Sequence, residues 1–349
     1  MDASPSWQTR PRRLPHRSLS RHAVCPLDLR FVAWPLSPSS RRPENRPRIR
    51  SRKDTPLNKL LRNDHGQLRN GWWILLFVAV FLASQLVYHP VSKGLQGIGA
   101  GKGWLAPLPV VFLLLVTGIC MRLRRQRLSG VGLRLDAAWW RHALCGTTLG
   151  TAQMLAVAAL IFLAGGVRFE LDPARGLAAL AYGIWFFTWV AVLEELLFRG
   201  FVFQRLVDGI GAPTALLLTG VLFAIAHWGN PGMEGSTMAW ATLDNGLGAI
   251  LLGLAYLRTG SLALPIGIHF GWNWTQGSLL GFDVSGLTQT GWLLPHLLDK
   301  PQWLSGGAFG PEASIFAVVV DALAVLLLWR WKGTARHPRA VRLPAGEAA

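Results

Sequence analysis

The sequence predicts an all-α membrane protein, a polytopic helical bundle of about eight transmembrane helices with both termini in the cytoplasm. The 349-residue chain is 51% hydrophobic and only 15% charged, whereas soluble proteins carry roughly 25% charged residues. Its charges gather toward the two ends of the chain, and apolar stretches recur between them. Many of these stretches approach the length of about 20 residues that crosses a bilayer.

Eight apolar stretches are candidate spans, and tryptophans recur near their ends, as is typical of residues at a membrane interface. The sixth is the weakest, because it contains Asp244, Asn245 and three glycines. The eight predicted spans are 72–89, 104–121, 143–167, 176–203, 212–228, 238–257, 262–282 and 313–331.

Basic residues orient these spans. Arginines and lysines precede the first span, lie between the second and third, the fourth and fifth, and the sixth and seventh, and follow the eighth. If there are eight spans, all five places lie on one side of the membrane, which the positive-inside rule assigns to the cytoplasm. We therefore expect an even number of spans in a multi-pass protein of the cell (inner) membrane, of bacterial origin.

The N-terminal segment, residues 1–70, is basic and rich in Pro and Arg, with 16 Lys/Arg against 5 Asp/Glu. Such a segment cannot bury enough apolar surface to offset the entropy lost on ordering. We expect it to be disordered, or an upstream stretch that is not translated, rather than an arm that binds anionic lipid or nucleic acid.

The remaining chain divides into four parts. Three N-terminal transmembrane helices fall in residues 71–170, and a catalytic core of four transmembrane helices in 176–282. An external loop, 283–312, leads to the last transmembrane helix and a basic cytoplasmic tail in 313–349.

Charge occurs where the fourth span should be apolar. The uncharged run 176–193 leads directly to Glu194, Glu195 and Arg199. An ionisable residue in a span costs about 2.5–3.5 kcal/mol on insertion scales, so it marks a candidate functional site. Glu195 and Arg199 are four residues apart, which places them on one helix face. We expect this pair to support the scaffold.

Two histidines accompany these carboxylates. His227 follows Phe223 by four residues near the end of the fifth span, and His269 precedes Asn273 by four in the seventh. Glu194 and His227 are equally distant from a turn signal at residues 208–213, so in an antiparallel helix pair they reach similar depth.

A carboxylate that faces an imidazole can take a proton from water while the imidazole orients that water. A second imidazole and an amide, here those of His269 and Asn273, can donate to a developing oxyanion. Alternatively, Glu194, His227 and His269 match a catalytic zinc set with an open position. No HExxH helix is present in the sequence, so both interpretations stay open.

Three segments resemble the motifs of the CPBP family, membrane proteins that include CAAX prenyl endopeptidases and bacteriocin-processing or immunity proteins (Abi-like). They are EELLFR (194–199), FAIAH (223–227) and HFGWN (269–273), and the resemblance covers about residues 176–280. It implies that Glu194 is the general base and that His227 holds the water. It also implies oxyanion stabilisation and structural support by His269, Asn273, Glu195, Arg199 and Phe223.

The leading hypothesis is a membrane-embedded endopeptidase of CAAX protease type, metallo- or glutamate-dependent, that cleaves a membrane-associated or prenylated peptide near the cytoplasmic face. Its expected partners are the lipid bilayer and a peptide or protein substrate, with Zn²⁺ as the candidate cofactor and no specific nucleic-acid binding. The first alternative is a non-catalytic scaffold or bacteriocin-immunity protein. The second is an ion or proton transporter using Glu194, Glu195 and Asp321. We otherwise expect Asp321 to make a structural contact, toward Asp244 and Asn245.

Overall fold

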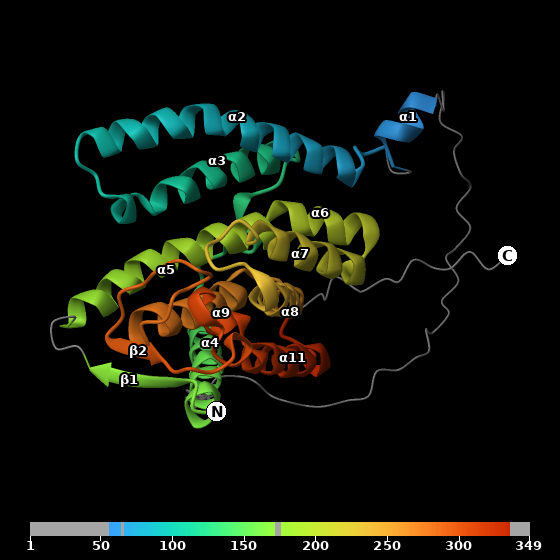
Figure 1. Cartoon of the computed structure of the whole chain (residues 1–349). Coiled ribbons are helices and arrows are strands. Elements are labelled where there is room, and N and C mark those ends of the chain that lie inside the picture. The colour runs from blue at the N-terminus through green and yellow to red at the C-terminus, as the bar shows by residue number, and fades with distance from the viewer. Residues whose placement is uncertain (1–55, 64–65, 172–175, 336–349) are drawn as a thin grey trace, which may run out of the picture.

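A computed structural model describes residues 56–63, 66–171 and 176–335 of the protein. Within these ranges the chain is a bundle of helices with two short strands beside it (Figure 1). Most of the predicted disordered segment 1–70, namely residues 1–55, lies outside the described residues.

Five helical segments of the described chain are long and apolar enough to cross a membrane. They begin with α2 (Asn70–Gly97), α3 (Pro107–Leu123, preceded by a 3₁₀ turn from Lys102) and α4 (Ala137–Leu163). The fourth is the segment Gly176–Ile210, which combines α5 (Gly176–Arg199) with α6 (Phe201–Ile210), and the fifth is α8 (Gly235–Thr259). The predicted all-α, multi-pass membrane bundle is thus confirmed.

The other three predicted spans contain shorter helices. They are α7 (Ala212–Ala226), α9 (Ala263–Asn273, continued by a π-helical turn Trp274–Leu279) and α11 (Ile315–Arg330). At 1.5 Å per residue, each is shorter than the roughly 30 Å hydrocarbon core. The exact count of eight spans therefore stays a prediction.

Several helices extend past the predicted bounds because polar residues continue or cap them. Helix α2 passes through Pro90 to Gly97. Helix α4 begins six residues before the predicted span, where the Asp136 side chain accepts a 2.9 Å hydrogen bond from the Trp139 backbone N–H. The turn predicted at 208–213 is present, since α6 ends at Ile210 and Gly211 adopts a φ of 85° before α7 begins.

Two short strands, which the sequence analysis does not predict, lie at one end of the bundle. Strand β1 (Val167–Leu171) pairs antiparallel with β2 (Leu293–Leu297), with Val167 opposite Leu297. The predicted external loop 283–312 therefore contains β2 and the short helix α10 (Gln302–Ser305). A further short helix, α1 (Pro56–Leu61), precedes α2.

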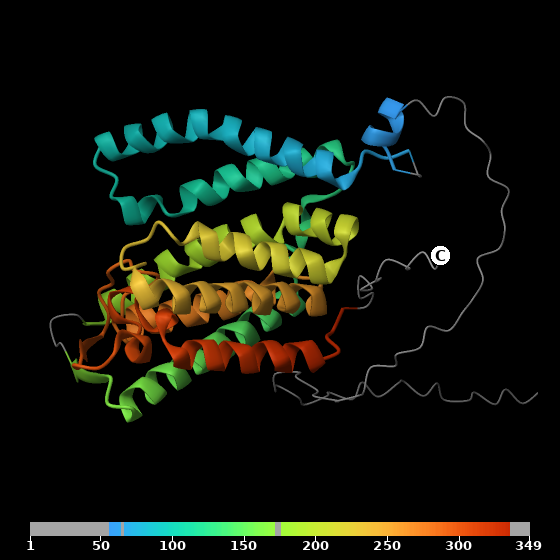
Figure 2. The same ribbon diagram turned by 45° about the vertical axis from the view of Figure 1, so that its right-hand side comes forward.

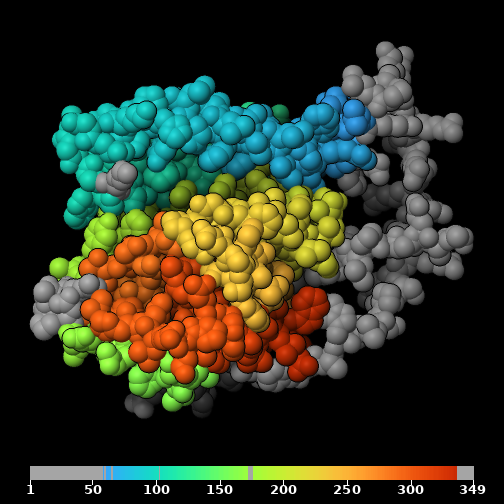
Figure 3. Space-filling view, in the orientation of Figure 1, coloured from blue at the N-terminus to red at the C-terminus, as the bar shows by residue number. Residues whose placement is uncertain are grey.

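The two ends of the bundle differ in chemistry. One end, here the arginine-rich end, carries the α6–α7 turn and the C-termini of α8 and α11, with Arg258 and Arg330 in their last turns (Figure 2). The opposite end, the loop end, carries the β1–β2 pair and segments 227–235 and 280–314. Figure 3 shows α2 and α3 as a layer over the rest of the bundle. Which end faces the cytoplasm stays a prediction.

Helices α4 and α9 pack closely through glycine. Gly146 and Gly150 of α4 face Gly267 and Gly271 of α9, and a Cβ atom on any of the four would overlap the backbone of the opposite helix. Small residues allow helix backbones to approach in membranes, where packing drives association. This contact fixes the rotation of α9, the helix that carries His269 and Asn273.

Candidate active site

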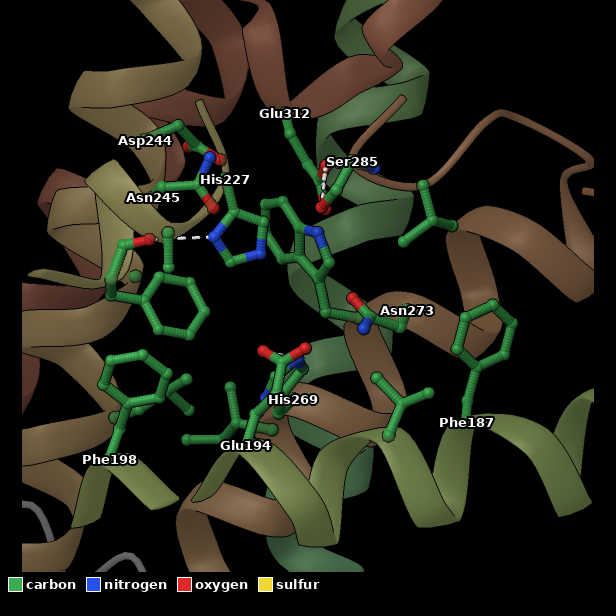
Figure 4. Close-up of a pocket in the computed structure, with 18 of the residues that line it drawn as sticks. Phe187, Glu194, Phe198, His227, Asp244, Asn245, His269, Asn273, Ser285 and Glu312 are labelled. Atoms are coloured by element: carbon green, nitrogen blue, oxygen red, sulfur yellow. Dashed lines mark hydrogen bonds and ion pairs between the residues drawn. The ribbon is translucent and has the colours of Figure 1, made fainter. Parts of the chain in front are cut away.

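A cavity of about 460 Å³ lies within the bundle and brings the predicted residues together (Figure 4). Glu194 reaches it from α5, His227 from the C-terminal end of α7, and His269 and Asn273 from α9. The four come from three segments far apart in the sequence. All four predicted catalytic side chains therefore line one space.

Glu195 is the central support of this site. Its side chain is fully buried, and its Oε1 accepts a 2.8 Å hydrogen bond from Arg199 and a 2.9 Å hydrogen bond from Nδ1 of His269. Arg199, also fully buried, donates to the Ala249 carbonyl of α8 at 2.9 Å. The predicted Glu195–Arg199 pair is confirmed. Its hydrogen bonds also join α5 to α8 and α9, which the sequence analysis does not predict.

Glu194 is the carboxylate available to a substrate. Its side chain is 26% exposed, whereas that of Glu195 is fully buried. Its Oε2 lies 3.7 Å from Nε2 of His269, beyond direct hydrogen-bond distance, and has no hydrogen-bond partner among the described residues. A carboxylate so placed can accept a proton from a water in the cavity.

His227 is held by its own helix. Its Nδ1 is 2.8 Å from the Phe223 carbonyl oxygen, and because a carbonyl only accepts, Nδ1 carries the proton. In the neutral ring, Nε2 is then free to accept a hydrogen bond. The centroid of the Phe223 ring lies 4.6 Å from that of the imidazole and 5.2 Å from the Arg199 guanidinium. In the described part of the chain, no hydrogen bond joins Glu194 directly to His227.

His269 and Asn273 are buried, 8% and 7% exposed. A carboxylate only accepts, so the hydrogen bond to Glu195 places a proton on Nδ1 of His269. Nε2 then accepts in the neutral ring and donates only when the ring carries both protons. Asn273 lies one helical turn after His269. Its amide can donate a hydrogen bond whether the His269 ring is neutral or doubly protonated.

The zinc alternative finds no support in this arrangement. Among the residues that the structure describes, no three His, Cys, Asp or Glu side chains are grouped closely enough to hold a metal ion. Nε2 of His227 and of His269 are the free ring nitrogens, but together with Glu194 they do not form a three-ligand set as placed. The zinc set of Glu194, His227 and His269 therefore stays a prediction.

The cavity also has polar lining residues that sequence reasoning did not assign to the site. Asp244 and Asn245 of α8 contribute, as do Ser285, Glu312 and Asp321. Asp244 and Asp321 could have been found as carboxylates inside apolar stretches. Glu312 lies in the predicted loop, where a carboxylate gives no such signal.

Glu312 illustrates how the loop end closes over the cavity. It lies in a short 3₁₀ turn (Pro311–Ala313) before α11 and is 6% exposed. Its Oε2 accepts hydrogen bonds from the Ser285 N–H at 2.7 Å and the Ser285 hydroxyl at 2.9 Å. Burial raises the pKa of the Glu312 carboxyl above its usual value, while the Ser285 hydroxyl, His227 and the Ser285 N–H oppose that rise.

The fold and the cavity define a class of protein: a multi-pass membrane protein with a cluster of Glu, His and Asn side chains around one cavity within the bundle. Residues 175–275 match the family model of Rce1-like proteins, with the description type II CAAX prenyl endopeptidase Rce1-like. The match covers residues 175–275 of the 349-residue chain, so this segment is similar to that family of prenyl endopeptidases. Searches of the curated proteins and of the solved structures found no significant match.

Proposed function

We propose that the protein is an intramembrane endopeptidase that hydrolyses a peptide bond of a membrane-associated or prenylated, CAAX-type peptide. The observation that carries the proposal is the convergence of Glu194, His227, His269 and Asn273 on one cavity. The match to a family of prenyl endopeptidases supports it.

In the proposed mechanism, Glu194 is the general base. It takes a proton from a water in the cavity as the water oxygen attacks the carbonyl carbon of the scissile bond. Nε2 of the neutral His227 accepts the second hydrogen of this water and so fixes its direction. The protonated Glu194 then gives its proton to the leaving nitrogen, which completes hydrolysis without any other reactant.

The negative charge that develops on the carbonyl oxygen needs donors placed in advance. The Asn273 amide is such a donor, and the doubly protonated ring of His269 is a second. Glu195 acts through His269, because its hydrogen bond to Nδ1 directs Nε2 toward the cavity. Glu195 and Arg199 are thus positioning residues.

The test compares the wild type with Glu194→Gln, purified and reconstituted into liposomes that contain a fluorogenic farnesylated CAAX peptide. We expect the variant to lose at least about 10²-fold in kcat, the contribution of a positioned general base, while inserting and unfolding as the wild type does. Glu234→Gln, which removes an exposed carboxylate at the loop end, is the matched control.

The same comparison separates the scaffold alternative. If the protein is a non-catalytic scaffold or immunity protein, Glu194→Gln keeps the shape of the side chain and leaves the cellular phenotype intact. Proteolysis at the wild-type rate in Glu194→Gln would sink the proposed mechanism.

A further inference from the structure

The cavity contains a second group of carboxylates outside the proposed catalytic set. Asp244, Glu312 and Asp321 all line it, and they are only 4%, 6% and 4% exposed. In the view of Figure 4, Asp244 and Glu312 lie on the far side of His227 from Glu194. We call these three residues the acidic subsite.

The glycine at 248 brings two members of the acidic subsite together. Gly248 lies four residues after Asp244, on the same face of α8. A Cβ atom at Gly248 would stand 3.2 Å from Oδ2 of Asp321, so the Asp321 carboxylate lies against α8 about one turn from Asp244. When Asp244, Asp321 and Glu312 are ionised, they are close enough to repel one another.

The three carboxylates of the acidic subsite differ in their hydrogen-bond partners. Glu312 accepts two hydrogen bonds from Ser285, and Asp321 accepts one from the Gln153 amide at 3.4 Å. Oδ1 of Asp244 is buried and has no hydrogen-bond partner among the described residues. A buried polar atom without a partner costs free energy, so Oδ1 of Asp244 can accept a hydrogen bond from a donor that enters the cavity.

Among the described residues, no Lys or Arg side chain supplies that donor. The described residues that line the cavity include no Lys or Arg, and the buried Arg199 is directed to Glu195 and Ala249. The cavity therefore combines four carboxylates, those of the acidic subsite and Glu194, with only two imidazoles as bases. Such a surface attracts a cationic group and disfavours an anionic one.

We propose that the acidic subsite binds the side chain of a Lys or Arg residue of the peptide substrate, with its charged group between Asp244 and Asp321. Ammonium and guanidinium groups offer several donors and no acceptor, which matches carboxylates that can only accept. The described side chains form no group that could hold a metal ion, which favours an organic cation. The inference rests on the proposed function only in taking the ligand to be a peptide substrate.

The test measures binding rather than cleavage, with the Glu194→Gln protein in phosphatidylcholine nanodiscs. The probes are N-acetylated, C-amidated apolar heptapeptides that carry Lys, Arg, Gln or norleucine at one position, moved in turn along the peptide. At the matching position, we expect the Lys and Arg peptides to bind about tenfold tighter than the Gln peptide, as charge-assisted hydrogen bonds provide. Asp244→Asn and Asp321→Asn should each reduce this preference toward one.

Glu234→Gln is the control, because it removes an exposed carboxylate at the same end of the bundle and should leave the preference unchanged. Unfolding temperatures identify any variant that fails to fold. If one of the two Asn variants does not fold, the other still tests the subsite. Equal affinity for all four peptides, or a preference that survives both Asn substitutions, would overturn the subsite. A wild type that binds the Lys peptides yet does not cleave the farnesylated CAAX peptide would overturn the proposed function and leave the subsite standing.

Discussion

Glu195 and His269 lie 74 residues apart in the sequence and are joined by a 2.9 Å hydrogen bond from Nδ1 of the histidine to Oε1 of the glutamate. The same oxygen accepts from Arg199. The buried carboxylate of Glu195 therefore has two roles. It neutralises Arg199 within α5, and it orients the His269 side chain that is proposed to act on the substrate. Different substitutions around Glu195 should therefore separate effects on stability from effects on catalysis.

Removing only Glu195 should strongly destabilise the protein. Glu195→Leu leaves the buried Arg199 without its carboxylate, and breaking a buried pair costs about 3–5 kcal/mol. We expect a large fall in unfolding temperature, which tryptophan fluorescence of the protein in detergent measures. The double variant Glu195→Leu/Arg199→Leu should recover part of the loss, because no charge is left unpaired. Arg141→Gln, at an exposed position, is the control, and a double variant no more stable than the single would contradict this account.

Asn273→Ala should reduce turnover with little effect on binding. The proposed donation from the Asn273 amide is strongest to the charged oxyanion, so its loss should lower kcat by about 10²–10³-fold and leave KM nearly unchanged. Steady-state kinetics on the farnesylated peptide measure both constants. A variant that raises KM and keeps kcat would show that Asn273 holds the substrate in the ground state instead.

The glycine contact between α4 and α9 should tolerate no methyl group. Gly271→Ala places a Cβ against the Thr147 backbone, so the helices must separate and we expect a lower unfolding temperature together with lost activity. Gly118→Ala in α3 is the matched control, because nothing lies within 4 Å of its Cβ position. There the substitution should be neutral or stabilise by about 0.5–1 kcal/mol. Equal effects of the two substitutions would show that the close contact is unimportant.

The cavity is expected to open on the non-cytoplasmic side. Its lining includes Leu287 and Gln289, which belong to the loop end, while the positive-inside rule assigns the arginine-rich end to the cytoplasm. A cysteine at the exposed Thr288 should react with a membrane-impermeant maleimide in intact cells. One at the exposed Arg127 should react only after permeabilisation. The reverse labelling pattern would restore the expectation of cleavage near the cytoplasmic face.

Much of the site could be predicted because helix geometry is local. A spacing of four residues was enough to predict the Glu195–Arg199 pair, since this contact forms within a single helix. The hydrogen bond from His269 to Glu195 depends instead on how α5 and α9 meet, which no spacing encodes. Glu312 reaches the cavity through a loop, where a carboxylate carries no penalty that would single it out.

Hydropathy predicted where the apolar helices lie in the sequence better than it predicted their lengths. Hydropathy finds residues that prefer lipid, whereas helices end where their backbone groups find other partners. Helix α4 thus starts at the Asp136 cap, ahead of its apolar run. The β1–β2 pair joins residues more than a hundred positions apart, so no local pattern indicates it.

The glycine contact between α4 and α9 determines which part of the chain the candidate site needs. On α9, His269 follows Gly267 by two residues, and Asn273 follows Gly271 by two. Two residues correspond to about 200° of rotation around the helix axis. The face that holds α4 is therefore nearly opposite the face that meets the cavity. The α4 segment, residues 137–163, precedes the family-matched region, which starts at 175. A chimera that transfers only residues 175–275 to another protein would contain all three motifs but lack α4, whose packing orients His269 and Asn273. The smallest segment that can be transferred with its site intact therefore starts at α4.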